Sequence, residues 1–198
     1  MTSNALRRMT VATLITALAA SAVFAVDSPS GTPEGIPPRT VADYLRSVIM
    51  AHRHIYTIDI VNRLHQEGIV GASENWRATH SLPLPAQFVR ETSEIVELTS
   101  PNVRYRLVSQ WPIHKANAPA TPFERQGLEA VQNHPNKPYY GIVEGETGRL
   151  FGAVYADKAV TSSCIECHNA HPKSPKSDFK LDDVMGGLVI TFPLNTKK

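Results

Sequence analysis

The 198-residue sequence contains only two cysteines, Cys164 and Cys167, which excludes a fold stabilised by several disulfides. A charge excess of one sign is also absent. The 20 basic and 18 acidic residues leave a formal charge of +2, which gives no reason to expect nucleic-acid binding. A hydrophobic fraction of 42% nevertheless suffices for a core and excludes wholesale disorder. The length fits one domain with extensions.

Long apolar runs are absent except at residues 11–20, which follow Arg7 and Arg8. This run precedes small residues at the −3 and −1 positions, Val23 and Ala25, and is short for a membrane span, which needs roughly 20 residues. We expect residues 1–25 to be a secretory signal cleaved near Ala25 rather than a retained anchor. The mature chain would then be periplasmic, without a membrane span. Loss of Arg7 and Arg8 would leave 18 basic residues (20 − 2) against 18 acidic ones.

The remaining sequence predicts one α+β domain over residues 40–195, after a lead-in at 26–39 that is rich in Pro, Gly and Ser. The strongest predicted helix covers residues 41–67, with Thr40 as its cap and Gly68 as its stop. Residues 75–85 are expected to form a loop. The other expected elements are helices at 86–98 and from Thr121 to before Pro135, and strands at 103–107, 139–143, 150–155 and 187–193, the middle two as a hairpin.

The segment Cys164-Ile165-Glu166-Cys167-His168 is the sharpest chemical motif in the sequence. It matches the C-x-x-C-H pattern of covalent haem attachment. Each thiol adds across a vinyl group of the porphyrin, and the adjacent histidine reaches the iron from one face. We therefore expect one haem c, bound by Cys164 and Cys167, with His168 as the proximal iron ligand.

Three other interpretations of the motif remain open. A redox-active cysteine pair would need a thioredoxin-like strand–motif–helix setting, and the motif lies late in the chain, after two expected strands. A zinc site using Cys164, Cys167 and His171 would lack a fourth ligand. A structural disulfide is compatible with an oxidising compartment. Export favours haem, because bacteria attach haem to this motif outside the cytoplasm.

The motif does not specify the second axial ligand of the iron, which can be His, Met, Cys or Tyr, or be absent. His52 is the first candidate, because it lies on the apolar stripe of the predicted helix at 41–67. His54 is the alternative, and Met50 on the same helix is a weaker candidate. Another side chain or an open position completes the alternatives.

The sequence resembles a bacterial family of PAS-like c-type haem domains, which are exported mono-haem modules and long formed a domain family of unknown function. The resemblance covers roughly residues 40–194. It rests on several segments in one order, namely 53–57, 82–88, 105–112, 117–119, 123–125, 164–172 and 182–187.

The resemblance implies a PAS-like antiparallel sheet with a long N-terminal helix and a covalently bound haem c. It also implies that Cys164 and Cys167 bind the porphyrin and that His168 is the proximal ligand. A distal ligand from the first helix is known in the family, where its residue type varies and can be Cys. His52 falls near that place, and this sequence has no spare Cys. The residues that the resemblance places around the haem are Tyr105, Arg106, Trp111 and Asn117.

Three functions are compatible with this site. Family members occur ahead of kinases, cyclases or chemoreceptors, so we first expect redox or small-gas sensing, here with a separate signalling partner. The alternative is periplasmic electron transfer to a redox partner protein. An enzyme acting on peroxide or a nitrogen oxide would need a general acid–base group beside an open iron, and no constellation of residues argues for catalytic side chains. The chain could also pair as a homodimer.

If His52 is the distal ligand, the purified ferrous protein will be six-coordinate and low-spin and will react slowly or not at all with CO. Absorption spectra of both redox states, with and without CO, measure this. The variants His52→Ala and His54→Ala then identify the ligand. If neither variant alters the spectrum, both assignments are wrong.

Overall fold

A computed structural model describes residues 35–145 and 148–194, so the predicted signal and most of the lead-in lie outside the described residues. The described elements belong to the compact unit 36–198. Its helical segments are α1 (Pro38–Ile55), the π-helix η1 (Tyr56–Asn62), α2 (Arg63–Gln66), α3 (Trp76–Thr79), α4 (Pro85–Thr99), the 3-10 helix η2 (Lys115–Asn117), α5 (Pro122–Asn133) and α6 (Ser162–Ala170). Its strands are β1 (Ala72–Ser73), β2 (Leu82–Pro83), β3 (Arg104–Val108), β4 (Tyr139–Gly145), β5 (Gly148–Lys158) and β6 (Val184–Pro193).

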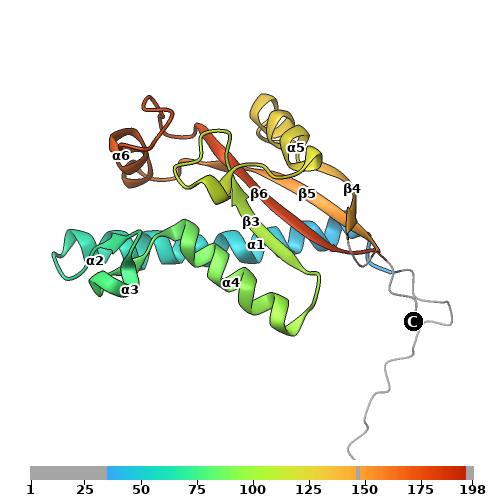
Figure 1. The fold of residues 1–198 in the computed structure, drawn as a ribbon, viewed down its shortest axis with the longest axis horizontal. Helices are drawn as coiled ribbons and strands as arrows, with labels where there is room; N and C mark the ends of the chain where they lie inside the picture. Colours follow the sequence, from blue (N-terminus) through green and yellow to red (C-terminus); the bar gives the residue numbers. More distant parts are fainter. Residues whose placement is uncertain (1–34, 146–147, 195–198) are drawn as a thin grey trace, which may run out of the picture. The chain divides into compact units, whose positions relative to one another are not determined.

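Four strands form the central antiparallel sheet, in the order β3-β6-β5-β4. Strands β4 and β5 form the predicted hairpin, and the last strand pairs with both β3 and β5. Helices pack on this sheet, so the predicted α+β class with an antiparallel sheet is confirmed (Figure 1).

Helices α1 and α5 cover opposite faces of the sheet (Figure 1). Because side chains alternate along a strand, Ala153 and Tyr155 pack in the cluster on α1, whereas Val154 packs in the cluster on α5. Helix α5 begins with the predicted capping box: the Glu124 amide donates to Thr121 Oγ1 at 3.1 Å, and the Glu124 carboxylate accepts from the Thr121 amide.

The long first helix is confirmed, although its start and its regularity differ from the prediction. It begins at Pro38 with Pro37 as the N-cap, because proline already has helical φ at the first turn, so Thr40 lies inside the helix. A π-helical segment, Tyr56–Asn62, interrupts it before α2 ends near Gly68, whose φ of 69° suits glycine. Among the described residues, no helix is both long and apolar enough to cross a membrane.

The loop predicted at 75–85 is wrong in part. It contains the single-turn helix α3 and strand β2, which pairs in parallel with β1 over two residues. Elements of two and four residues are too short to show a hydrophobic period, so pattern analysis does not detect them.

Gly186 allows β3 and β6 to approach closely next to the site described below. A Cβ at Gly186 would lie 2.2 Å from the Val108 carbonyl oxygen, which is backbone and cannot rotate away. We expect Gly186→Ala to lower the free energy of unfolding by about 3 kcal/mol, as overpacking does. The matched control Gly71→Ala adds a methyl 3.5 Å from its nearest neighbour, His65, and should be close to neutral. Equal stability of the two variants in urea denaturation would contradict this.

Candidate functional site

Helix α6 carries the cysteine–histidine motif near one end of the sheet (Figure 1). Thr161 caps the helix: its Oγ1 accepts from the Cys164 amide at 3.4 Å and lies 3.2 Å from Cys164 Sγ. Helical spacing puts Cys164, Cys167 and His168 on one face, since residues three and four apart are neighbours. Both cysteines are free thiols, and Cys167 is exposed.

The imidazole of His168 is partly buried, and one of its nitrogens lacks a hydrogen-bond partner among the described residues. This atom, Nδ1, is itself buried. Burial lowers the pKa of His168, with Arg53 and His171 acting in the same direction and Asp157 opposing them. The ring is therefore neutral at neutral pH, which is the form that binds metals.

Phe179 packs against His168 of the motif, and Trp111 packs against Phe179. The Phe179 and His168 rings meet edge-on with their centroids 6.0 Å apart. The Phe179 and Trp111 rings also meet edge-on, with their centroids 5.6 Å apart. Asn169 fixes the Phe179 backbone, since its Nδ2 donates to the Phe179 carbonyl at 2.9 Å and its Oδ1 accepts from the Phe179 amide at 3.0 Å. Met185, which is buried, packs in this same cluster with Cys164. Methionine is a residue type that can ligate haem iron, and the methionine named as a candidate above was Met50 rather than Met185.

Two charged contacts flank the motif. Arg53 of α1 donates to the Asp157 carboxylate near the end of β5, in an ion pair that is largely buried. On the other side, Glu74 lies 3.5 Å from His171 Nε2. Burial raises the pKa of the Cys167 thiol, and Cys164 and Glu74 add to this effect. The motif therefore faces α1 and the segment around β1 at once.

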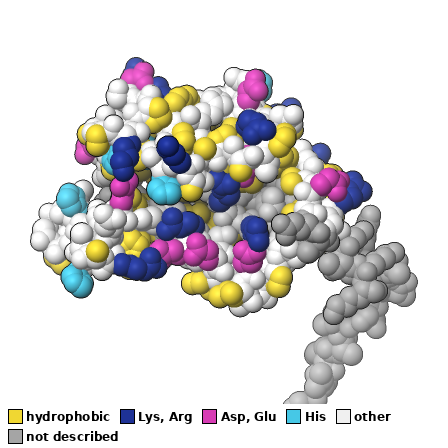
Figure 2. Space-filling view, in the orientation of Figure 1, with side chains coloured by type: hydrophobic (Ala, Val, Ile, Leu, Met, Phe, Trp, Pro, Cys, Tyr) yellow, Lys and Arg dark blue, Asp and Glu magenta, His cyan; other side chains and the backbone are white. Residues whose placement is uncertain are grey.

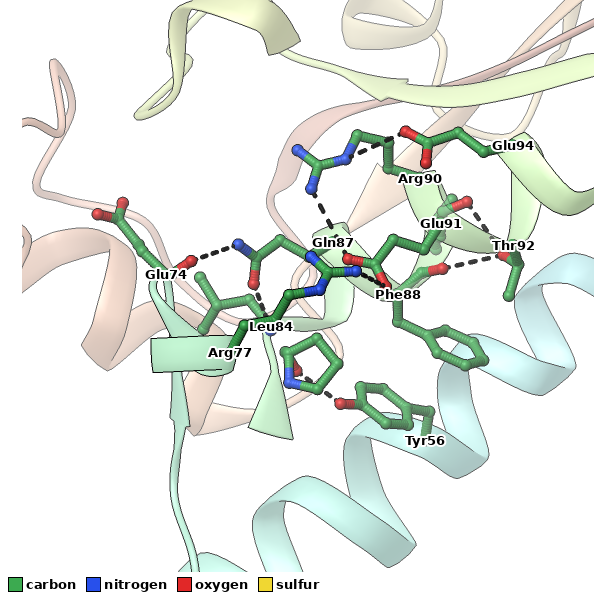
Figure 3. A network of polar contacts seen from close by, with 12 residues as sticks. Tyr56, Glu74, Arg77, Leu84, Gln87, Phe88, Arg90, Glu91, Thr92 and Glu94 are labelled. Carbon is green, nitrogen blue, oxygen red and sulfur yellow. Dashed lines mark hydrogen bonds and ion pairs between the residues drawn. The ribbon is translucent and has the colours of Figure 1, made fainter. Parts of the chain in front are cut away.

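A polar network holds the segment that carries Glu74 (Figure 3). Gln87 donates to the Glu74 carbonyl at 2.8 Å and accepts from the Leu84 amide at 2.8 Å. Tyr56 stacks on Phe88 with ring centroids 4.3 Å apart and donates to the Pro83 carbonyl at 2.6 Å. Burial, together with the nearby Glu91 carboxylate, raises the pKa of Tyr56 to about 12. These contacts tie η1, β2 and α4 into one support.

Charge does not mark the site by itself. Figure 2 shows basic and acidic side chains interspersed over the face in view, without a broad area of one sign. This agrees with the near balance of charges in the sequence.

Neither predicted distal ligand is brought into contact with His168. His52 is exposed and lines an apolar pocket of about 210 Å³ with residues of α1, α4 and β3, including Tyr105. His54 is exposed as well. The α1 residue whose charge acts on the pKa of His168 is Arg53, which pairs with Asp157. The expectation that His52 lies on a buried apolar stripe is therefore wrong, because α1 buries Ala42 and η1 buries Tyr56, whereas His52 is exposed. The ligand assignments themselves stay predictions.

The residues expected around the haem fall into different places. Trp111 lies in the cluster with Cys164, and Tyr105 lies in the pocket with His52. Arg106 forms an ion pair with Glu124 at 3.2 Å and donates to backbone carbonyls at residues 116 and 118. The Asn117 carbonyl accepts from the Ser109 amide at 2.9 Å. Arg106 and Asn117 thus hold the loop between β3 and α5.

The donor set fits a haem better than a bare metal ion. Among the described residues, no group of three or more His, Cys, Asp or Glu side chains could hold a metal ion. A porphyrin supplies four nitrogen ligands itself, so the protein needs only one or two axial side chains. A neutral imidazole with a buried, unpartnered nitrogen next to two free thiols meets this need.

Comparison with known proteins gives one match. A family model described as Tll0287-like (Tll0287) matches residues 10–193, a range that contains every described helix and strand. No curated protein and no solved structure matches the chain.

Asn169 should control the order of the loop beneath the motif. We expect Asn169→Ala to speed hydrogen exchange at the Phe179 amide by at least about tenfold, because a buried amide loses its acceptor. The matched control Glu166→Ala changes an exposed side chain of the same helix and should leave that exchange rate unchanged. Unchanged exchange in Asn169→Ala would show that the side chain does not hold the loop.

Proposed function

The chain belongs to the Tll0287-like family, and from this premise we propose that it is an exported, mono-haem c-type cytochrome of the periplasm. Cys164 and Cys167 would hold the haem by thioether bonds, and His168 would ligate its iron. The observation that carries the proposal is the C-x-x-C-H motif on one helical face, with a buried His168 nitrogen that has no partner among the described residues. When bound, the haem supplies a one-electron couple or a binding position for a small ligand.

The surrounding side chains have defined tasks in this proposal. Phe179 packs on the edge of the His168 ring and Trp111 packs on Phe179, and the burial of the ring favours the neutral, iron-binding imidazole. Thr161 orients Cys164 at the start of α6, so that the thiols of Cys164 and Cys167 would face the same haem. Asn169 keeps Phe179 in place through two backbone hydrogen bonds.

We assign the protein to redox or small-gas sensing with a PAS-like domain. An antiparallel sheet with a long N-terminal helix is the arrangement that this description implies, and both are present. The support for sensing is the Arg53–Asp157 ion pair, through which the end of β5, just before the motif, contacts α1. A separate protein would receive the signal.

The alternative is electron transfer in the periplasm. It is favoured by the exposure of Cys167, which would put one edge of the haem near the surface, where a redox partner could approach. The CO measurement described above separates small-gas sensing from redox sensing and from electron transfer. The variant Met185→Leu belongs in that series, since Met185 packs beside Cys164.

Covalent attachment is tested by expressing the full chain in the periplasm of a bacterium with a haem-c maturation system. We expect a haem stain to remain with the polypeptide after denaturation, because thioether bonds survive unfolding. Cys164→Ser and Cys167→Ser should weaken or abolish the stain, whereas Glu166→Ala, at a variable position of the motif, should keep it. A wild-type chain without covalent haem would refute the proposal.

A further inference from the structure

The Arg53–Asp157 ion pair is a feature that haem attachment does not require. Arg53 lies in the last turn of α1, and Asp157 lies near the end of β5, more than a hundred residues later in the sequence. Their side chains are only 16% and 10% exposed. Two charges have thus been removed from water at the point where α1 meets the strand that leads into α6.

The backbone is irregular three residues after Arg53 and directly at Asp157. The π-helical segment begins directly after α1, and Thr57 Oγ1 donates to the Arg53 carbonyl at 2.7 Å. On the sheet side, the register of β5 against β6 shifts between Asp157 and Lys158. π-Helical turns and β-bulges re-aim side chains and occur often beside functional sites. Irregular backbone thus lies close to both members of the ion pair.

Stability alone does not account for this pair. The cost of removing both ions from water offsets most of their attraction, and apolar replacements of similar size are often as stable. Burial alone would lower the pKa of Arg53, but Asp157, with a contribution from Cys164, raises it above the ordinary value. Arg53 thus remains a cation, and Asp157 is its counter-ion.

The pair also lies next to the motif in the fold. Asp157 is two residues before Ala159, which packs in the same buried cluster as Cys164. The opposite effects of Arg53 and Asp157 on the pKa of His168 agree with this placement. Inside a protein such interactions act over longer distances than in water, because the effective dielectric constant is lower. A change of charge at the group bound there would be felt by both side chains.

We propose that Arg53 and Asp157 are positioning residues that set the reduction potential of the group held by His168, Arg53 raising it and Asp157 lowering it. The inference rests on the proposed haem binding. Ferric haem carries one more positive charge than ferrous haem, so a fixed cation favours the reduced state and a fixed anion favours the oxidised state. The pair would hold the potential between the values that either charge alone would impose.

The test is spectroelectrochemical titration of the haem-loaded full chain. Arg53→Gln should lower the midpoint potential and Asp157→Asn should raise it. Each should change the ferric-to-ferrous ratio at a fixed electrode potential by about tenfold. Arg53→Lys keeps the charge and should restore the wild-type potential, and Arg53→Gln combined with Asp157→Asn should lie near it.

A matched control is Arg104→Gln, which breaks the exposed Arg104–Glu97 pair and should leave the potential unchanged. Shifts of the same sign in Arg53→Gln and Asp157→Asn, or no shift in either, would overturn the inference. If Arg53→Gln does not fold, two variants still test the inference. Asp157→Asn should raise the midpoint potential, and Arg53→Lys should leave it unchanged. A wild-type chain without haem would refute the proposed function and this inference with it, whereas loaded variants without shifts refute the inference alone.

Discussion

The burial of the His168 ring without a partner for its Nδ1 atom among the described residues is the constraint on which the site depends. Leaving a buried polar atom unpaired costs about 1–3 kcal/mol, so the fold keeps this arrangement at a disadvantage unless something else binds the ring. The supports of the ring are extensive: Phe179 meets its edge, Asn169 fixes Phe179, and Trp111 packs behind it. A ring held in this way, next to two free thiols, suits the proposed haem, whose iron would bind the imidazole.

Around this ring the fold joins segments that are distant in the sequence. Helix α1 contributes Arg53, strand β5 contributes Asp157, and the segment around β1 contributes Glu74, which reaches His171. The sheet provides the rigid platform, because its two faces are covered by α1 and α5 (Figure 1). An ion pair therefore joins α1 to the end of β5, just before α6, which is the connection that the proposed sensing would use, while the exposure of Cys167 would suit the proposed approach of a redox partner.

The sequence allowed much of the scaffold to be predicted, because its signals are local. The capping box at Thr121, the stop at Gly68 and the hairpin of β4 and β5 all follow from a few adjacent residues. Helix α6 was missed, since its nine residues show little amphipathic pattern and its start depends on one threonine cap. The predicted apolar stripe of the first helix is buried only in part: Val41 and Leu45 pack against the core, whereas His52 is exposed. Val48 and Ile55 lie on the same apolar stripe as His52, yet they are 55% and 52% exposed. The apolar pattern of α1 alone does not determine which of its residues are buried, because this depends on tertiary packing.

The central claim is that the motif on α6 carries one covalent haem. Intact-mass spectrometry of the protein recovered from the periplasm under denaturing conditions, followed by peptide mapping, tests it most directly. The account predicts a chain whose mass is increased by one haem, with the addition mapped to the peptide that contains Cys164 and Cys167. A mass equal to the polypeptide alone, or one reduced by the two hydrogens of a Cys164–Cys167 disulfide, would contradict it.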